Sequence, residues 1–523
     1  MSLSLQVREG DRPPREFPAP TDPRQTLADW LEHHGHPLNT RCGGRGLCQG
    51  CLVHLDVPDA PAAPPARACL IAARDLPPPP FGIRIPTTSC RDATLHGVTA
   101  FDLRAPGDPP PPRPGHGLAL DIGTTTVAGA LWDFSTGRCL AEASVPNAQR
   151  RHGDNVVSRV GFAVDHPDGL ARLRRDLIDE SLRPLLDQLC RRAALTPAAL
   201  TQAVAAGNPA MLHTLAGAPL RGLATFPFRP AFLGDRRLPA ADHGLPFSCP
   251  LDLLPGLGPF VGSDITAGAL ASGLLADEAP VLLIDFGTNG EILLKHRDGY
   301  LATATAAGPA FEGGRLACGA PARPGVISSL ARADGRWTWT LTGGDPAAKP
   351  RGISGAAYVD FIAIAARDGL INRYGRLDRA HPAVTTVASA PPGAAVRVAL
   401  NDELYISEAD LAELLQAKAA IAAGVATLLE LTGLAPADLR ALHVAGGFGY
   451  HLQPAHARAI GLLPDVPLDR VSLIGNSSLG GASLLLHPHQ RPALDALLAH
   501  TRVIELNQIP SFEDHFTDAL ALP

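Results

Sequence analysis

The chain has 523 residues, enough for about two to four structural units, and 46% of them are hydrophobic, which allows sizeable cores. Its formal net charge of −6 argues against a basic surface for nucleic acid. The first residues show no basic stretch followed by an apolar run, and the longest apolar runs are far too short to cross a bilayer. We therefore expect a soluble cytoplasmic protein that uses neither nucleic acid nor a membrane.

Four of the nine cysteines lie near the N-terminus with the spacing C-x5-C-x2-C-x17-C. Cytosolic thiols stay reduced, so a tight cluster indicates a metal site rather than disulfides. The glycines between these cysteines allow unusual backbone angles and let N–H groups point at cluster sulfurs. Four thiolates can hold two irons bridged by two sulfides, so we predict a [2Fe–2S] cluster on Cys42, Cys48, Cys51 and Cys69. A four-cysteine zinc site is the alternative that the spacing leaves open.

The cysteine segment is similar to that of [2Fe–2S] ferredoxins of the β-grasp fold. This resemblance implies a ferredoxin-like domain, which we place at residues 1–98, with strands at 52–57 and 81–85. The sequence APGDPPPPRPGH then forces polyproline II and forbids helix or central strand. We predict that residues 99–116 form a proline-rich, semi-rigid linker. The remaining 117–523 form the larger part of the protein.

The larger part contains an internal repeat that begins at Gly117 and again at Val281. Each copy has an apolar strand, an Asp-x-Gly-Thr turn, a second apolar strand, a glycine-containing turn and a third strand. Two such units predict a duplicated α/β fold with two lobes. We place lobe I at about 117–278 plus a C-terminal part, and lobe II at about 279–460. A capping serine and a long apolar face predict a helix over 407–432.

The two Asp-x-Gly-Thr turns have the composition of phosphate-binding loops. Backbone N–H groups and threonine hydroxyls suit phosphate oxygens, and an aspartate at the strand end suits Mg²⁺-bound water or the attacking water. Two loops from opposing lobes can clamp the β- and γ-phosphates between them. We predict Asp121 and Asp285 as the catalytic residues. The predicted phosphate contacts are Gly123, Thr124, Thr125, Thr126, Gly287, Thr288 and Asn289.

A third glycine-rich element, AGGFG, follows a short apolar strand near the C-terminus. Gly446 and Gly447 would let adenine and ribose lie against the backbone, and we assign Phe448 to the adenosine side. The order of first loop, small-residue helix over 264–275, second loop, these glycines and a closing helix from Gly475 resembles the superfamily of actin, heat-shock chaperone ATPases and sugar kinases. The resemblance implies a two-lobed, actin-like (ribonuclease H-like) ATPase domain that binds ATP and Mg²⁺.

Two further runs, NAQRRHGDNVVSRV at 147–160 and GNPAMLH at 207–213, resemble a narrower family. That family is the reductive activators of corrinoid proteins, ferredoxin-fused ATPases that return inactive cob(II)alamin to cob(I)alamin in methyltransferase systems. The resemblance covers nearly the whole chain. It implies ATP-dependent passage of low-potential electrons from a [2Fe–2S] cluster to cob(II)alamin. It also implies a corrinoid protein and an electron donor, either a flavoprotein or a ferredoxin, as partners, and it is compatible with a homodimer.

Several residues are weaker candidates for this site. Superfamily members often place a helix lysine near the ribose, which makes Lys418 a candidate, although a solvated lysine is the alternative. Glu312, in GPAFEGG, is a second candidate. We interpret His213 as a core histidine. His152 and Asp154 are expected on a functional surface without an assigned role.

Three other functions remain open from the sequence. One is a redox-sensing ATPase whose cluster controls ATP turnover. Another is an ATP-driven electron donor to a different low-potential enzyme; the activators of radical-type dehydratases usually carry a cluster bridged between subunits, which an N-terminal ferredoxin module argues against. The third is a sugar or small-acid kinase with a fused electron carrier, for which the sequence offers neither a convincing base nor a sugar pocket.

Overall fold

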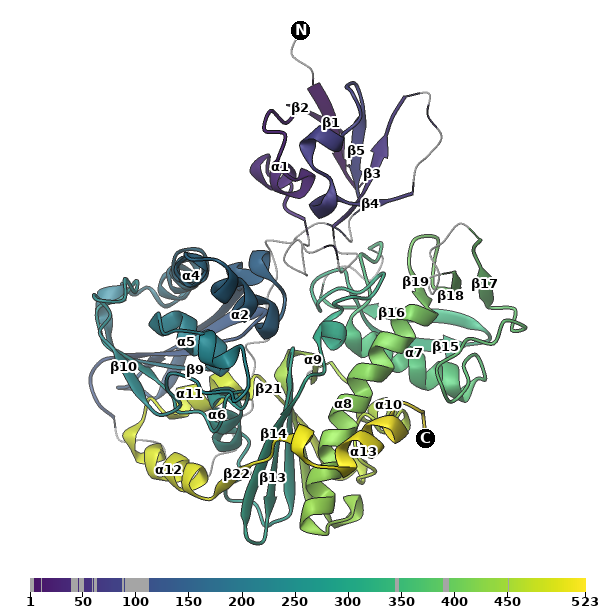
Figure 1. The fold of residues 1–523 in the computed structure, drawn as a ribbon. Coiled ribbons are helices and arrows are strands. Elements are labelled where there is room, and N and C mark those ends of the chain that lie inside the picture. The colour runs from purple at the N-terminus through teal and green to yellow at the C-terminus, as the bar shows by residue number, and fades with distance from the viewer. Residues whose placement is uncertain are drawn as a thin grey trace.

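The computed structural model describes residues 4–10, 12–38, 46, 51–58, 60, 64–86, 89, 112–343, 348–388, 395–449 and 451–523. Figure 1 shows a small N-terminal domain next to two larger lobes, each built around its own sheet. The smaller domain lies over the side of the molecule where the two lobes face each other.

The N-terminal domain has the β-grasp topology. Its sheet has the order β2-β1-β5-β3-β4, with β1 and β5 parallel at the centre and a helix in the connection between them. That helix, α1 (Leu27–His33), is capped by the side chain of Thr26 and buries Trp30 and Leu31 against the sheet. The strands are β1 (Ser4–Glu9), β2 (Arg15–Pro18), β3 (Leu52–Asp56), β4 (Ala66–Arg67) and β5 (Gly82–Ile85). The predicted fold class is confirmed here, and β3 and β5 lie within one residue of the expected ranges.

The first lobe contains a six-stranded sheet of order β10-β11-β9-β6-β7-β8. Its strands are β6 (His116–Ile122), β7 (Thr126–Asp133), β8 (Arg138–Pro146), β9 (Leu200–Gly207), β10 (Arg236–Leu238) and β11 (Leu251–Leu253). One face packs against the helices that connect β8 to β9 and follow β9. These are η4 (Ala148–His152), α2 (Val156–Asp165), α3 (Gly169–Leu177), the π-helical turn η5 (Ile178–Leu182), α4 (Arg183–Ala193) and α5 (Pro209–Ala216).

The second lobe contains a six-stranded sheet of order β21-β20-β12-β13-β14-β22. Its strands are β12 (Val281–Phe286), β13 (Gly290–His296), β14 (Gly299–Thr305), β20 (Ala441–Ala445), β21 (Val471–Gly475) and β22 (Thr501–Val503). Two small sheets extend this lobe: β15 (Ile327–Ala333) with β16 (Arg336–Leu341), and β17 (Val384–Thr386) with β18 (Val396–Ala399) and β19 (Tyr405–Ser407). Its helices include η8 (Pro309–Glu312), α7 (Gly355–Arg367), α8 (Glu408–Thr432), α9 (Gly446–Gly449), α10 (Pro454–Ala459) and α13 (Ser511–Ala519).

The two large sheets repeat one arrangement, which confirms the duplicated fold. In the first lobe, β6 pairs antiparallel with β7, β7 with β8, and β6 lies parallel to β9. In the second lobe, β12, β13, β14 and β20 repeat these pairings in the same sense. Each Asp-x-Gly-Thr turn therefore connects the first two strands of its sheet. Both turns lie beside the carboxyl end of a parallel neighbour strand, where open α/β sheets bind ligands.

The lobes exchange segments near the C-terminus. Helix α6 (Ser263–Ala271) packs against α11 (Ser477–Leu484), and α11 also packs against β6 and β9 of the first sheet. Strands β21 and β22, however, pair with β20 and β14 of the second sheet. The second sheet thus extends beyond the expected limit at residue 460, because two strands from the last fifty-odd residues complete it. Helix α12 (Arg491–Ala499) returns to the first lobe beside α6.

Helix α8 forms the centre of the second lobe's helical layer. It starts at the predicted capping serine, Ser407, which forms a capping box with Asp410, and it ends at Thr432, with Gly433 as the C-cap. Among the described residues it is the one helix with the length and hydropathy of a membrane span, but 72% of that window is buried inside the protein. Its apolar residues belong to the core of the lobe.

Candidate functional site: an interlobe phosphate cleft

A cleft of about 1180 Å³, including its solvent-open part, lies where the two lobes face each other. Residues from both Asp-x-Gly-Thr turns, from η8, from α9 and from the start of α11 line it. Twelve of the residues singled out in the sequence meet here: Asp121, Gly123, Thr124, Thr125, Thr126, Asp285, Gly287, Thr288, Asn289, Gly446, Gly447 and Phe448. The structure thus brings together the two predicted catalytic residues and the ten residues predicted to contact phosphates or adenosine.

The first loop follows β6 and turns tightly into β7. A Cβ at Gly123 would lie 2.5 Å from the carbonyl oxygen of Thr126, so only glycine fits this turn. The Thr124 hydroxyl accepts a 3.0 Å hydrogen bond from the Asn208 side chain, which also caps α5. The loop is therefore fixed by the run GNPAMLH as well as by its own strands.

Residues of the run at 147–160 donate hydrogen bonds to the backbone of the same loop. Asn147 donates a 2.8 Å hydrogen bond from its side chain to the carbonyl of Gly123, and its backbone N–H donates to the carbonyl of Thr125. Arg159 is fully buried and donates to the carbonyls of Thr124 and Gly153 at 2.6 and 2.8 Å. Burial lowers the pKa of the Arg159 guanidinium to about 9. These bonds give the segment a structural function, the support of the first Asp-x-Gly-Thr loop.

The second loop follows β12, and the third glycine-rich element lies against it. Gly446 has φ +89°, and a Cβ there would lie 2.3 Å from the Phe286 carbonyl and 2.7 Å from an Asp285 carboxylate oxygen. The glycine therefore permits close approach of the β20–α9 turn to the second loop. The Phe448 ring packs on the rings of Phe311 and Phe286, with centroids 4.7 and 5.3 Å away. Its ring belongs largely to the core of the lobe, although the residue also borders the cleft.

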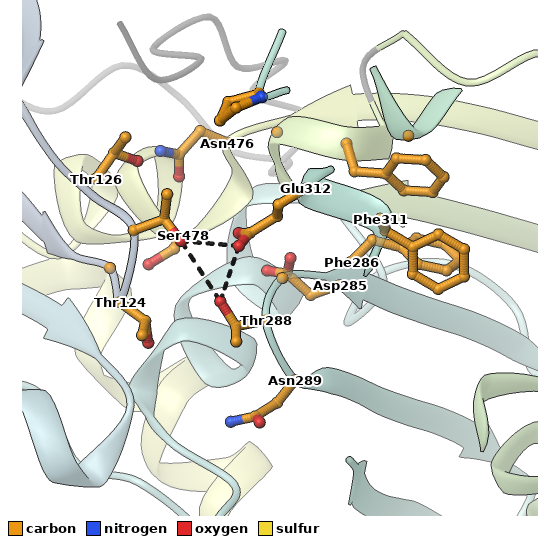
Figure 2. Close-up of a pocket in the computed structure, with 18 of the residues that line it drawn as sticks. Thr124, Thr126, Asp285, Phe286, Thr288, Asn289, Phe311, Glu312, Asn476 and Ser478 are labelled. Carbon is orange, nitrogen blue, oxygen red and sulfur yellow. Dashed lines mark hydrogen bonds between the residues drawn. The ribbon is translucent and has the colours of Figure 1, made fainter. Parts of the chain in front are cut away.

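One glutamate connects the loops of the two lobes. Glu312 Oε2 accepts hydrogen bonds from the hydroxyls of Thr125 at 2.8 Å and Thr288 at 3.0 Å, and these two hydroxyl oxygens are 3.5 Å apart (Figure 2). Desolvation raises the pKa of the Glu312 carboxyl, while the two threonine hydroxyls oppose that shift. Glu312 was the weaker candidate in the sequence, and the structure places it at the junction of the loops.

The floor of the cleft is strongly acidic. Asp121 accepts 2.9 Å hydrogen bonds from the side chains of Asn476 and Ser478, at the start of α11. Burial, followed by the charges of Asp264 and Asp121, raises the pKa of Asp285 to about 8. Burial, followed by a smaller contribution from Asp121, raises the pKa of Asp264 to about 7. On β13, burial and neighbouring carboxylates raise the pKa of Glu291 well above its usual value.

This field favours a cation. Within the described ranges, no group of three or more His, Cys, Asp or Glu side chains is arranged to hold a metal ion. Mg²⁺ is usually bound by one or two carboxylates together with waters and substrate phosphates. The chemistry of the donor set therefore fits a magnesium ion that enters with the nucleotide.

Sequence reasoning missed Arg159, which supports the first loop, and five residues that line the cleft: Asn208, Asp264, Glu291, Asn476 and Ser478. Glu291 had a signal, because it is a lone carboxylate in an apolar strand. Asn476 also had one, as the cap before a small-residue helix. Asp264 reaches the cleft, and Arg159 reaches the first loop, only because distant chain segments fold together.

Two other assignments can be decided. Lys418 does not line the cleft; its ammonium group donates to the carbonyls of Ala519 and Ala521 near the C-terminus. The suggestion that it lies near the ribose is wrong, because the C-terminal segment occupies its donors. His213 is fully buried, hydrogen-bonded to the Pro209 carbonyl and stacked on Phe232, which confirms a core histidine.

His152 ends η4, and Asp154 lies between η4 and α2. His152 contacts the Asp176 carboxylate at 2.8 Å and stacks on Phe162. Asp154 accepts a 3.3 Å hydrogen bond from Arg150. Both side chains are largely buried, so they stabilise the η4–α2 segment instead of presenting a free surface.

The cysteine cluster is described only in part, because Cys42 and Cys48 lie outside the described residues. Cys51 and Cys69 are both buried in the N-terminal domain, and the Ala68 N–H donates to the Cys51 carbonyl. A hydrogen bond from Cys69 lowers the pKa of the Cys51 thiol to about 6. A sulfur that favours the thiolate next to a second cysteine is the chemistry that a metal cluster requires.

Family models match both lobes of the larger part of the chain. The profile described as "RACo middle region" matches residues 116–277, and "C-terminal domain of RACo the ASKHA domain" matches residues 279–523. The chain is 32% identical over 427 residues to the "Corrinoid activation enzyme RamQ" of Eubacterium limosum, covering 77% of this chain and 70% of that protein. It is 25% identical over 403 residues to the "[Co(II) methylated amine-specific corrinoid protein] reductase" of Methanosarcina barkeri, covering 71% and 70%.

One solved structure resembles nearly the whole chain. The structure of a "Reductive activator for corrinoid,iron-sulfur protein" has a TM-score of 0.71 and 26% sequence identity, covering 99% of this chain and 98% of that one. The similarity therefore includes the N-terminal domain as well as both lobes.

Proposed function

The chain belongs to the family of reductive activators of corrinoid proteins, and from this premise we propose what each of its two parts does in the reaction. The protein is an ATP-dependent activator of a corrinoid protein. The interlobe cleft binds and hydrolyses ATP with Mg²⁺. The N-terminal domain passes single electrons that convert cob(II)alamin to cob(I)alamin on the docked partner.

One observation supports the assignment of the cleft as the ATP site. Loops from the two lobes meet with the Thr125 and Thr288 hydroxyls 3.5 Å apart, above an acidic floor. A phosphate group between them would receive hydroxyl and backbone N–H donors from both sides. Asp121 and Asp285 would hold waters on Mg²⁺ or orient the attacking water. Gly446 and Gly447 lie on the same cleft wall, where we place the adenosine.

For the electron site we propose Cys42, Cys48, Cys51 and Cys69 as the four ligands. A [2Fe–2S] cluster accepts and releases one electron at a time. The chain's own part is to keep Cys51 as a thiolate and to bury both described sulfurs. We place the domain boundaries near residues 98 and 116, and the proline-rich stretch between them would let the domain move from its donor, a flavoprotein or ferredoxin, to the corrinoid protein.

The coupling follows from linkage. ATP promotes reduction only if it favours the complex in which cobalt is readily reduced over the resting complex. Closure of the two lobes on nucleotide is the element that can supply this preference, because the cleft joins segments of both lobes. A homodimer would present two such clefts, and gel filtration with light scattering would decide that point.

The direct test uses the full chain with an anaerobically reconstituted cluster, a cob(II)alamin-loaded corrinoid protein and a reductant. We expect cob(I)alamin absorbance to appear only with MgATP. Asp285→Asn and Cys51→Ala should abolish it, whereas Asp298→Asn in an exposed turn and Cys139→Ala outside the cluster should not. ATP hydrolysis without cobalt reduction across several corrinoid proteins would instead favour a redox-sensing ATPase or a different low-potential client.

A further inference from the structure

We propose that Glu312 competes with the terminal phosphate of ATP for the loop hydroxyls, and that this competition makes the cleft discriminate between nucleoside triphosphate and diphosphate. The inference deepens the proposed function and rests on it, because it requires the cleft to be the nucleotide site. Its basis is the single carboxylate oxygen that accepts from both lobes (Figure 2).

A threonine hydroxyl that donates to Glu312 cannot donate to a phosphate at the same time. A threonine hydroxyl carries one proton and can donate one good hydrogen bond at a time. Thr125 and Thr288 both direct that proton to Glu312 Oε2. Their remaining lone pairs would face an approaching phosphate and repel it. To bind a phosphate between the loops, both hydroxyls must turn away from Glu312.

Glu312 cannot withdraw easily, because its short helix is wedged in place. A Cβ on Gly355, at the start of α7, would lie 1.9 Å from the Phe311 carbonyl, so the backbones are in close contact. Gly313, which follows Glu312, has φ +76°, and its Cβ would lie 2.4 Å from the backbone nitrogen of Ala320. The Phe311 ring is stacked on Phe448. The backbone that carries Glu312 is therefore held beside the loops, and in the proposed exchange it is the hydroxyls that reorient.

The charge balance explains why the competition depends on the third phosphate. The charge of Asp154 opposes ionisation of the Glu312 carboxyl, the charge of Arg150 favours it, and Arg159 also interacts with the Glu312 charge. A γ-phosphate adds negative charge and acceptor oxygens where the loops meet, while a diphosphate adds fewer. The triphosphate must consequently separate the threonine hydroxyls from Glu312, and the diphosphate can leave them in place.

The test compares binding rather than turnover. Full-length wild type, Glu312→Gln and Glu312→Ala would be titrated calorimetrically with MgADP and with the Mg²⁺ complex of a non-hydrolysable ATP analogue. Gln keeps the shape but removes the charge, so we expect the analogue to bind about tenfold more tightly while ADP affinity stays within about twofold. Glu513→Gln, an exposed carboxylate on α13, is the matched control and should change neither affinity.

The outcomes separate the inference from its premise. If the wild type binds neither nucleotide, the ATP site itself is wrong. If it binds both and the ratio of the two affinities in Glu312→Gln and in Glu312→Ala is the same as in the wild type, the competition does not exist. Weaker analogue binding in both variants would also overturn it, because Glu312 would then support the triphosphate. Melting curves would verify that at least one variant is folded.

Discussion

Arg159 holds the carbonyl oxygen of Thr124 with a 2.6 Å hydrogen bond, although the two residues are 35 positions apart. The same guanidinium donates to the Gly153 carbonyl and to the Gln149 side chain, so it joins η4, α2 and the first phosphate loop. A fully buried guanidinium with this many partners is a fixed support. The geometry of the loop therefore depends on a residue that never reaches the cleft.

We expect Arg159→Lys to weaken ATP binding. Lysine keeps the positive charge but lacks the planar fork, so at least one buried carbonyl loses its donor, at about 1–3 kcal/mol. The loop should loosen, with the apparent ATP affinity falling about tenfold and the melting temperature dropping in the same variant. Nucleotide titration and thermal unfolding measure the two effects. Arg191→Lys, an exposed position on α4, should change neither, and an unchanged ATP affinity in Arg159→Lys would contradict the supporting role.

Asp285 should make the protein less stable as the pH rises. Its pKa is raised from about 4 to about 8, so the folded protein retains a proton that the unfolded chain has released. This contribution to stability is complete below about pH 4 and disappears as the pH approaches about 8. Asp285→Asn should therefore flatten the pH dependence of the melting temperature between about pH 5 and pH 8 and be the more stable protein at pH 8. Thermal unfolding without nucleotide measures this; a parallel pH dependence in the variant would refute it.

Cys69→Ala should remove the cluster and leave ATP binding intact. The change removes a proposed ligand and the hydrogen bond that lowers the pKa of Cys51, so the visible absorption and the reduced-state EPR signal of the cluster should be lost. ATP affinity should stay within about twofold, because the cleft residues all lie in the other domain. Metal analysis of the wild type tests the alternative of a four-cysteine zinc site. Stoichiometric zinc without visible absorption would show that the site holds zinc instead of iron.

The sequence was most informative where function depends on local geometry. The two Asp-x-Gly-Thr turns could be recognised because a tight turn after an apolar strand leaves a short, repeated pattern, and Gly123 shows why the pattern is strict. The same holds for the cap at Ser407, where the capping partner is three residues away. Such features carry their physical cause within a few neighbouring residues.

The missed residues have causes that are distant in the chain. Asp264, on α6, lines the same cleft as Asp121, on β6, because the two elements meet in the folded chain. The sequence analysis placed Lys418 near the ribose, but the carbonyls that accept its hydrogen bonds belong to residues 519 and 521, about a hundred positions away. Neither pair of partners is separated by a short, recognisable spacing in the sequence. Only the folded structure could therefore reveal these contacts.

Lys418 should anchor the C-terminal helix rather than serve the nucleotide. Its ammonium is partly desolvated, which lowers its pKa to about 8, and it donates to the carbonyls of Ala519 and Ala521. Lys418→Met would leave both carbonyls without this donor. We expect faster hydrogen exchange across α13 and the residues after it, with ATP affinity unchanged within about twofold.

The matched control is Lys349→Met, which removes an exposed lysine that pairs with Glu403 on the surface of the same lobe. Surface ion pairs contribute little, so α13 should exchange as in the wild type. If Lys418→Met instead weakened ATP binding while protection of α13 stayed intact, the lysine would have to act on the nucleotide after all. A loss of both would mean that the C-terminal segment and the cleft are coupled through α8, because α8 carries Lys418 and packs on α13.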